Sequence, residues 1–284
     1  MRKRRFWIIP TALVILTVAF ILRIIAVCPD VTDLKTQNPG ETRLMTYRES
    51  QYESEGVRVS KRQHWVPLSR ISPHLIRAVL ISEDDKFYDH EGFDWEGIRE
   101  AIEKNWQKRR IVMGGSTITQ QLAKNLYLKP TRNPIRKIQE ACIASRLEKT
   151  LSKRRILELY LNVIEWGRGV YGVEAASQTY FNKPASDLGI SQAVRLASVL
   201  PNPIRFSPLS DSSKRMMKKR LTIAERMLQK HWINDAEYRH LIDELEGKPA
   251  PQHIDASSMP PDSTSVPAIP PVQTVPDISV RSSP

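Results

Sequence analysis

The sequence predicts a mainly α-helical domain that follows one membrane-spanning helix. Residues 6–28 form an apolar run behind a cluster of basic residues, which is typical of a membrane anchor. From residue 65 to residue 246, apolar residues recur at helical spacing, Pro and Gly mark helix starts and loops, and no convincing run of alternating strand residues occurs. The 284 residues are 40% apolar and 26% charged, which leaves room for one substantial domain with flanking segments.

The N-terminal segment is the predicted anchor. Residues 1–5 carry four basic side chains, and Arg23, near the far end, is the only charge in the apolar run that follows. At about 1.5 Å per helical residue the run covers about 30 Å, enough to cross a bilayer. The basic residues favour a cytoplasmic N-terminus, so we expect a single-pass protein of the cytoplasmic (inner) membrane with its domain on the outer, periplasmic face. A cleaved signal peptide is the alternative, but no clear small-x-small cleavage pattern is present.

Three further segments follow the anchor. Residues 29–64 are polar and turn-rich, with a break at Asn38-Pro39-Gly40, and are expected to form an extracytoplasmic tether. Residues 65–246 hold the helical pattern of the catalytic domain. Residues 247–284 are rich in Pro and Ser without apolar periodicity, and this tail is expected to be disordered.

The charge balance indicates an anionic partner. The formal net charge is +12, which suits nucleic acid, anionic lipid headgroups or a phosphate-bearing substrate. A domain outside the membrane meets little nucleic acid, so none is expected as a partner. The basic run at residues 214–220 is interpreted as a solvated helix face or a membrane-surface contact. The chain has only two cysteines, Cys28 and Cys142, and their distant positions indicate neither a disulfide framework nor a zinc site.

The first candidate catalytic residue is Glu83. Ser72 and Pro73 predict a helix start, and Glu83 falls on the apolar stripe of that helix, seven positions after Ile76 and four after Val79. A carboxylate in place of an apolar residue near a helix C-terminus, where the dipole disfavours negative charge, suits a general base better than a stabilising role. The alternative is a frayed, solvated helix end.

A second candidate segment runs from Gly114 to Asn125. Its two glycines and a Ser cap predict a helix start, and Thr117, Gln120 or Gln121, and Lys124 form a polar stripe opposite an apolar one. Amides at this helix start, together with Lys124, could bind an anionic oxygen, although the pattern is not a Walker motif. A plain capped amphipathic helix is the alternative.

The second candidate carboxylate is Glu140, on a helix that begins at Asn133-Pro134. Arg136 and Lys137 precede it by four and three residues, so three charges converge on one helix face. This pattern indicates either an ordinary helical ion pair worth a few tenths of a kcal/mol or a carboxylate set by two cations that also hold a phosphate.

The remaining motifs give weaker indications of function. The run Gly167-Arg168-Gly169-Val170-Tyr171-Gly172 matches G-x-G-x-x-G, but a helix rather than a strand is predicted before it, so nucleotide binding is not expected. The histidines show no metal-ligand spacing. No Ser-x-x-Lys occurs in the chain, which removes the acyl-enzyme motif of penicillin-binding transpeptidases.

Together these segments resemble the peptidoglycan glycosyltransferase family, known as glycosyltransferase family 51, and in particular its monofunctional members, the biosynthetic peptidoglycan transglycosylases. The likeness spans about residues 65–210 and rests on four ordered motifs, namely Glu83–Gly92, Gly114–Asn125, Arg136–Glu140, and Ile156–Asn162 with its Gly-rich continuation. The resemblance implies a lysozyme-like helical domain with a smaller membrane-proximal lobe. It also implies polymerisation of lipid II into β-1,4-linked glycan strands, with inversion at the donor carbon and release of undecaprenyl diphosphate.

The resemblance further implies roles for single residues. Glu83 would be the general base for the 4-hydroxyl of the acceptor GlcNAc, and Glu140 would orient the neighbouring groups or assist departure. Cations at Lys124, Arg136 and Lys137 would stabilise the leaving diphosphate. The residues expected to line the substrate cleft are Ser116, Thr117, Gln120, Gln121 and Asn125, and those expected to shape the loop of the first motif are Asp84, Phe87 and His90.

The implied partners are lipid II, the growing glycan strand, membrane lipids and cell-wall synthesis proteins. The family allows a divalent cation, Mg or Mn, that bridges the diphosphate, but no ligand cluster in the sequence identifies a metal site. Two alternatives remain at this stage. A lytic enzyme would also use a glutamate to cleave glycan but needs no diphosphate site, and a catalytically silent scaffold of a cell-wall assembly complex needs neither glutamate.

Overall fold

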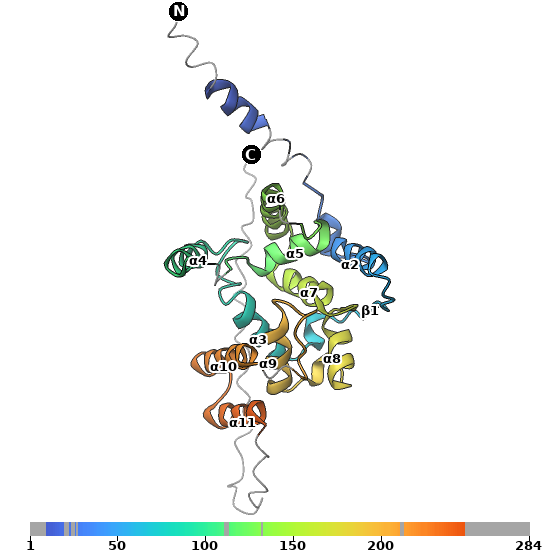
Figure 1. The fold of residues 1–284 in the computed structure, drawn as a ribbon, viewed down its shortest axis with the longest axis vertical. Helices are drawn as coiled ribbons and strands as arrows, with labels where there is room; N and C mark the ends of the chain where they lie inside the picture. The colour runs from blue at the N-terminus through green and yellow to red at the C-terminus, as the bar shows by residue number, and fades with distance from the viewer. Residues whose placement is uncertain are drawn as a thin grey trace, which may run out of the picture. The chain divides into compact units, whose positions relative to one another are not determined.

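The computed structural model describes residues 10–19, 23, 26, 28–110, 114–131, 133–210 and 213–247 (Figure 1). Contacts divide the chain into two units, Met1–Pro249 and Ala250–Pro284, and every described residue lies in the first. Helix dominates, as the sequence predicted. The α-helices are α2 (Arg43–Ser54), α3 (Pro73–Glu83), α4 (Trp95–Lys108), α5 (Ile118–Tyr127), α6 (Pro134–Thr150), α7 (Lys153–Val163), α8 (Val173–Phe181), α9 (Ile190–Val199), α10 (Lys214–Gln229) and α11 (Asp235–Glu246). Shorter elements are the 3-10 turns η1 (Thr32–Lys35), η2 (Leu68–Arg70) and η3 (Ala185–Asp187) and the strands β1 (Arg62–Gln63), β2 (Glu165–Gly167) and β3 (Val170–Tyr171).

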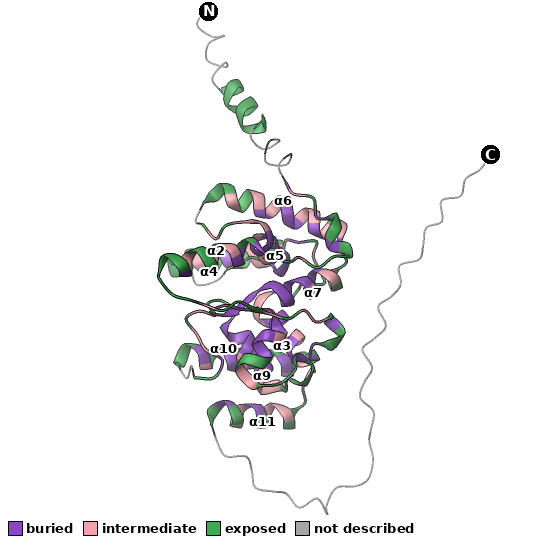
Figure 2. Cartoon of the chain, turned by 90° about the vertical axis from the view of Figure 1, so that its right-hand side faces the viewer, coloured by how far each residue is buried: buried purple, intermediate pink, exposed green. Residues whose placement is uncertain are grey.

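The predicted anchor lies partly, and the predicted tail almost entirely, outside the described residues. Residues 10–19 are helical and exposed (Figure 2). Within the ranges that the structure describes, no helix has the length and apolar character needed to cross a membrane. The spanning helix over residues 6–28 therefore stays a prediction, as does the character of the tail, of which only Gly247 is described.

Residues 29–64 differ from the polar tether that we expected. They contain α2, whose N-cap Thr42 accepts a hydrogen bond from the Met45 amide (3.2 Å), and α2 packs against α5. Leu44, Met45 and Tyr52 are buried there. Few apolar residues mark this helix, so its period is weak in the sequence, and the segment is folded against the domain along α2.

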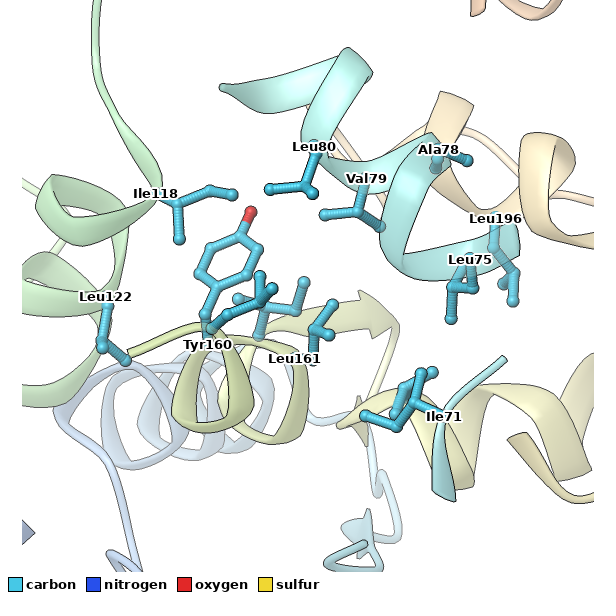
Figure 3. Packing of buried hydrophobic residues seen from close by; sticks show 14 of the residues in the cluster. Ile71, Leu75, Ala78, Val79, Leu80, Ile118, Leu122, Tyr160, Leu161 and Leu196 are labelled. Carbon is cyan, nitrogen blue, oxygen red and sulfur yellow. The ribbon is translucent and has the colours of Figure 1, made fainter. Parts of the chain in front are cut away.

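The helices form two groups that share one core. In one group α3 packs along α9, and α10 contacts both, with α11 packed against α10 and α9; in the other, α5 packs against α2, α6 and α7 (Figures 1 and 2). Figure 3 shows where the groups meet, with Leu80 of α3 near Ile118 of α5 and Tyr160 of α7. Burial of one such aliphatic side chain contributes about 1.5–3 kcal/mol. The shared core fixes the C-terminal end of α3 beside the N-terminal end of α5.

Helix α3 delivers Glu83 to this junction. Pro73 occupies the first helical turn, as predicted, and Leu75 and Val79 are fully buried on the inner stripe. Ser72 occupies the N-cap position, but its hydroxyl donates to the Leu188 carbonyl (2.7 Å) rather than capping the helix, which corrects the expected Ser cap. The helix ends at Glu83.

A small sheet was not predicted. Strand β1 pairs in parallel with β3, and β3 pairs antiparallel with β2. Strands of two or three residues are too short to show alternation in a sequence. The Gly-x-Gly-x-x-Gly run lies in this sheet and its turn: Gly169 has φ +73°, and a Cβ there would lie 2.8 Å from the Ser60 carbonyl oxygen. The glycines thus serve close backbone contacts in a hairpin, consistent with the expectation that they do not bind a nucleotide.

Helix α4 differs from the others in its surroundings. Asp94 caps it by accepting from the Gly97 amide (2.9 Å), but among the described elements its contacts are sparse. Trp95, Ile102 and Trp106 are exposed by 73%, 63% and 84%. This helix therefore presents an apolar face that the described part of the chain leaves open.

Candidate active site

Glu83 lines a cleft and is held by three donors. Its side chain is 10% exposed. The Ser82 hydroxyl donates to Oε1 (2.8 Å), the Gln121 amide donates to Oε2 (3.0 Å), and Lys219 Nζ lies 3.5 Å from Oε1. Glu83 is half-buried and surrounded by hydrogen-bond donors. It is therefore not the frayed, solvated helix end that the sequence left open as an alternative.

Tyr160 orients the Gln121 amide. The Tyr160 hydroxyl donates to Gln121 Oε1 (3.2 Å), which leaves the NH₂ group of Gln121 facing Glu83. Burial raises the pKa of Tyr160 well above its ordinary value, and the charges of Glu83 and Asp84 add to this effect. The phenol therefore stays a neutral donor, and α7 supports the carboxylate through Gln121.

Lys219 and Arg220 depart from the solvated face or membrane-surface contact expected of the basic run at residues 214–220, of which Lys214, Arg215 and Lys218 are exposed. Lys219 points to Glu83, and Arg220 is 1% exposed, with its guanidinium 3.4 Å from both Ser198 Oγ and the Pro208 carbonyl. Burial lowers the pKa of Lys219, an effect that Glu83 opposes and Arg215 reinforces. Helix α10 thus supplies the carboxylate with a partly desolvated cation.

The residues of the first motif tie the loop after α3 to the start of α5. Asp84 is buried; its Oδ1 lies 2.9 Å from His90 Nε2 and its Oδ2 accepts from the Ile118 amide (2.9 Å). His90 Nδ1 accepts from the Gly92 amide (3.1 Å), so Nε2 carries the proton that His90 donates to Asp84. Phe87 is buried, with Lys153 Nζ 4.5 Å from the centre of its ring. These contacts are structural, and they place Glu83 opposite α5.

Helix α5 begins one residue later than predicted. Thr117 is the N-cap rather than Ser116. Its hydroxyl accepts from the backbone N–H of Gln120 (3.2 Å), while the side-chain Oε1 of Gln120 accepts from the backbone N–H of Thr117 (3.1 Å). Gln120 is therefore used up in a capping box, and Asn125 is buried within the helix. Of the expected cleft residues, Ser116 and Thr117 line the cleft and Gln121 contacts Glu83, whereas Gln120 and Asn125 do not line it.

Glu140 forms ion pairs with two cations of α6, as the helical spacing of these residues predicted. Its side chain is 4% exposed, and Arg136 Nη1 donates to Oε2 (2.8 Å) while Lys137 Nζ donates to Oε1. Lys137 Nζ also lies 3.0 Å from Ser116 Oγ, at the edge of the cleft. The cation cluster, which we define as Lys124, Arg136 and Lys137, is thus joined to the loop before α5.

Lys124 stands between the two carboxylates. It is half-buried on α5, and burial lowers its pKa most strongly. Glu140 and Glu83 both raise the pKa of Lys124, whereas Arg136 and Lys137 lower it. The Lys124 ammonium group therefore interacts electrostatically with both glutamates, and it couples Glu83 to the rest of the cation cluster.

The cleft has a volume of about 670 Å³. Its walls come from the end of α3, the start of α4, the loop before α5 and the face of α10. Acidic lining residues are Glu83, Asp84, Asp85, Asp94, Glu96 and Glu100, and basic ones are Lys86, Arg215, Lys219 and Arg226. A space of this size with a recessed carboxylate can hold sugar units of a glycan.

A second cavity of similar volume, about 660 Å³, lies between α2 and the sheet. None of the catalytic or binding residues expected from the sequence lines it. In the described part of the chain, no group of three or more His, Cys, Asp or Glu side chains could hold a metal ion. Of the predicted site residues, Glu83, Asp84, Ser116 and Thr117 line the cleft, whereas Glu140 and the cation cluster are not among its lining residues.

Sequence reasoning missed Lys219, Ser82 and Tyr160 as neighbours of Glu83. A signal for Lys219 was present: it lies three residues after buried Met216 and four before buried Ile223, so it falls on the inner stripe of α10. Ser82 precedes Glu83 in the chain, but nothing in the sequence shows that its hydroxyl turns to the carboxylate. Tyr160 comes near the site only because α7 packs on α5, where it contacts Gln121.

Comparison with known proteins supplies the family. A family model described as "Transglycosylase" matches residues 50–228. A protein named "Biosynthetic peptidoglycan transglycosylase" from Dechloromonas aromatica is 53% identical over 190 residues, covering 67% of this chain and 82% of the relative. One with the same name from Aromatoleum aromaticum is 51% identical over 191 residues, covering 66% and 83%. The crystal structure of penicillin-binding protein 1A from Haemophilus influenzae matches 65% of this chain and 18% of its own, with 26% identity and a TM-score of 0.38.

Proposed function

The chain belongs to the transglycosylase family and is a peptidoglycan glycosyltransferase, and from this premise we propose that it polymerises lipid II with Glu83 as the general base. The observation that carries the assignment of Glu83 is its position: a recessed carboxylate lines the cleft, while a cluster of cations lies on the adjoining helices. The reaction joins β-1,4-linked disaccharide units and releases undecaprenyl diphosphate.

Glu83 begins the reaction by accepting the proton of the acceptor's 4-hydroxyl. The freed oxygen attacks the donor carbon from the side opposite the diphosphate, so a new C–O bond forms as the bond to the phosphate oxygen breaks. The electron pair of the broken bond leaves with the diphosphate, and the configuration at carbon inverts. Donors on both oxygens of Glu83 keep the carboxylate oriented before the hydroxyl arrives.

The cation cluster stabilises the charge that develops on the leaving diphosphate. Lys137 is 48% exposed and Arg136 22%, so both remain accessible to phosphate oxygens while Glu140 fixes their positions. Preorganised cations of this kind act without reorganisation cost at the moment of reaction. We assign Glu140 to positioning, because both of its oxygens are already engaged by Arg136 and Lys137.

A divalent cation, if the enzyme uses one, depends on the substrate for its ligands. The carboxylate nearest the cation cluster, Glu140, is saturated by two cations, and the described residues form no three-ligand metal site. The donor set of the described residues does not fit a resident metal.

We further propose that the enzyme works at the outer face of the cytoplasmic membrane. Support comes from the apolar run at residues 6–28, the net charge of +12 and the exposed Trp95, Ile102 and Trp106 of α4, a set suited to contact with lipid. A substrate with a polyprenyl tail stays in the bilayer, so anchored enzyme meets it at high effective concentration. Removal of residues 1–27 should slow turnover of long-chain lipid II more than that of a short-lipid analogue, and equal losses on both would contradict this placement.

The central test is polymerisation of labelled lipid II in detergent by wild type, Glu83→Gln and a matched control. Glu225→Gln is the control, because Glu225 is an exposed glutamate on α10. We expect polymer from wild type and from the control and none from Glu83→Gln. Small glycan fragments instead of polymer would indicate a lytic enzyme, and binding of lipid II without any product would indicate a scaffold.

A further inference from the structure

The only two cysteines of the chain lie near each other in the folded protein. Cys28 is the last residue of the predicted anchor, and Cys142 lies on α6, so 114 positions separate them in the sequence. Both line one small cavity of about 270 Å³, so two residues far apart in the sequence border the same space. Their separation along the chain offered no sign of this proximity.

The chain around Cys28 is fixed both to α6 and to the hydrophobic core. Arg146, one turn after Cys142 on α6, donates from Nη1 to the carbonyl oxygens of Cys28 (2.6 Å) and Pro29 (3.2 Å). Val31 and Leu34 then enter the hydrophobic core, where they are 2% and 7% exposed. The backbone that carries Cys28 is thus docked on α6, and the proximity of the two cysteines is a property of the fold.

We propose that Cys28 and Cys142 are a modification site, at which they form an intramolecular disulfide when the domain faces an oxidising compartment. The proposal rests on the placement of the domain outside the cytoplasm given under the proposed function, because thiols there are exposed to oxidants that the cytoplasm lacks. Both cysteines are free thiols in the described structure, which corresponds to the reduced form.

The oxidant is a disulfide-bearing thiol oxidoreductase or a small-molecule disulfide. Cys142 is the more accessible thiol, so its thiolate attacks the disulfide of the oxidant and releases one thiol. The Cys28 thiolate then attacks the Cys142 sulfur and displaces the second thiol. Two S–H bonds are lost and one S–S bond forms, while two electrons and two protons reduce the oxidant's disulfide to two thiols.

The surroundings of Cys28 suit a permanent bond better than a redox catalyst. Cys28 is buried, at 8% exposed, so a disulfide that contains it would be shielded from reductants once formed.

The bond would couple the anchor to the active site. Cys142 lies two residues after Glu140, so the disulfide would tie the chain as it leaves the membrane to the helix that carries Arg136, Lys137 and Glu140. It would also close a loop of more than a hundred residues, which restricts the unfolded chain strongly. We expect reduction to lower Tm by roughly 5–15 °C.

The first test uses purified full-length protein in detergent, equilibrated with oxidised glutathione, quenched with acid and alkylated. We expect wild type to lose two hydrogens in intact mass, to take up no alkylating reagent and to yield one peptide that joins Cys28 to Cys142. Cys28→Ser and Cys142→Ser are matched controls that each retain one reactive thiol. Two alkylated thiols, two bound glutathiones or only intermolecular dimers in wild type would overturn the proposal.

The second test quenches whole cells that express the full chain. A disulfide in this sample, and a Tm that reductant lowers in wild type but not in Cys28→Ser/Cys142→Ser, would support the proposal, whereas two free thiols would overturn it. If the bond nevertheless forms in vitro, the error would lie in the placement outside the cytoplasm and not in the geometry. Neither readout depends on lipid II, so failure of the proposed catalysis would be seen separately in the polymerisation assay.

Discussion

Glu83 and Glu140 are both recessed glutamates on helices at the cleft, yet their surroundings differ. Glu83 contacts two neutral donors and one lysine at 3.5 Å, and it lines the cleft. Glu140 is clasped by a guanidinium and an ammonium group, and it is not among the cleft-lining residues. The first carboxylate is therefore open to a substrate hydroxyl, whereas the second serves its neighbours. The difference teaches that ion pairing separates a base from a positioning group better than burial does.

The largest effect is expected for Glu83→Gln. The amide keeps the shape of the side chain but cannot take a proton, so kcat for polymerisation should fall by about 10²- to 10⁴-fold. Thermal stability should change little, because Glu83 forms one weak ion pair. Single-turnover assays with lipid II and a melting curve measure the two quantities. A variant that retains more than a tenth of wild-type kcat would remove Glu83 from the role of base.

Glu140→Gln should have a smaller effect on rate and a larger one on stability. Arg136 and Lys137 lose their shared carboxylate, and misplaced cations should cost up to about 100-fold in kcat/KM. A buried partner left unsatisfied costs about 1–3 kcal/mol in the free energy of unfolding. Glu41→Gln is the control, because it breaks an exposed pair with Lys61. If Glu140→Gln matched Glu83→Gln in kcat while keeping full stability, Glu140 would be a proton-transfer group itself.

Lys219→Met tests the cation beside the base. A charge-assisted hydrogen bond of about 1.5 kcal/mol corresponds to about tenfold in rate, so kcat should fall by about that factor at neutral pH. Because the pKa of Lys219 is lowered, wild type should lose activity as pH rises through that lowered value, and Lys219→Met should lack this alkaline limb. Lys219→Arg should retain most of the activity. An unchanged pH profile in Lys219→Met would show that the lysine does not position Glu83.

The same shift has a defined sign for stability. The folded protein holds the Lys219 proton less tightly than the unfolded chain does, so between the lowered pKa and the ordinary value of 10.5 the unfolded state binds more protons. The contribution of Lys219 to stability therefore rises with pH across that interval. Denaturant unfolding of wild type and Lys219→Met at several alkaline pH values measures this difference.

What the sequence could predict follows from how local each feature is. The cluster of Arg136, Lys137 and Glu140 lies within five residues of one helix, and helical spacing alone places those charges together. The position of Glu83 at the end of α3 is equally local. The mainly α character could be predicted for the same reason, because apolar periodicity is a property of each segment.

Contacts between distant segments could not be predicted. Lys219 meets Glu83 only because α10 packs on α3, and Cys28 and Cys142 line one cavity only because the chain at the end of the predicted anchor docks on α6. Helix α2 was missed because its buried residues are few, and the sheet because its strands are too short for alternation. The polar stripe of α5 was recognised from the sequence. The role of Gln120 in the capping box was not, because it depends on which residue begins the helix.

The adjacent glutamines of α5, Gln120 and Gln121, show the same contrast between a polar group that faces the site and one that is already engaged. Gln121 contacts Glu83 and Tyr160, whereas Gln120 is spent on the cap of its own helix. Gln121→Ala should lower kcat several-fold, as loss of a neutral hydrogen bond of about 1 kcal/mol requires, with little change in Tm. Gln120→Ala should do the reverse, at a cost of about 1 kcal/mol in the free energy of unfolding. Paired kinetics and denaturant titrations resolve the two effects, and a loss of kcat in Gln120→Ala with unchanged stability would return that residue to the cleft.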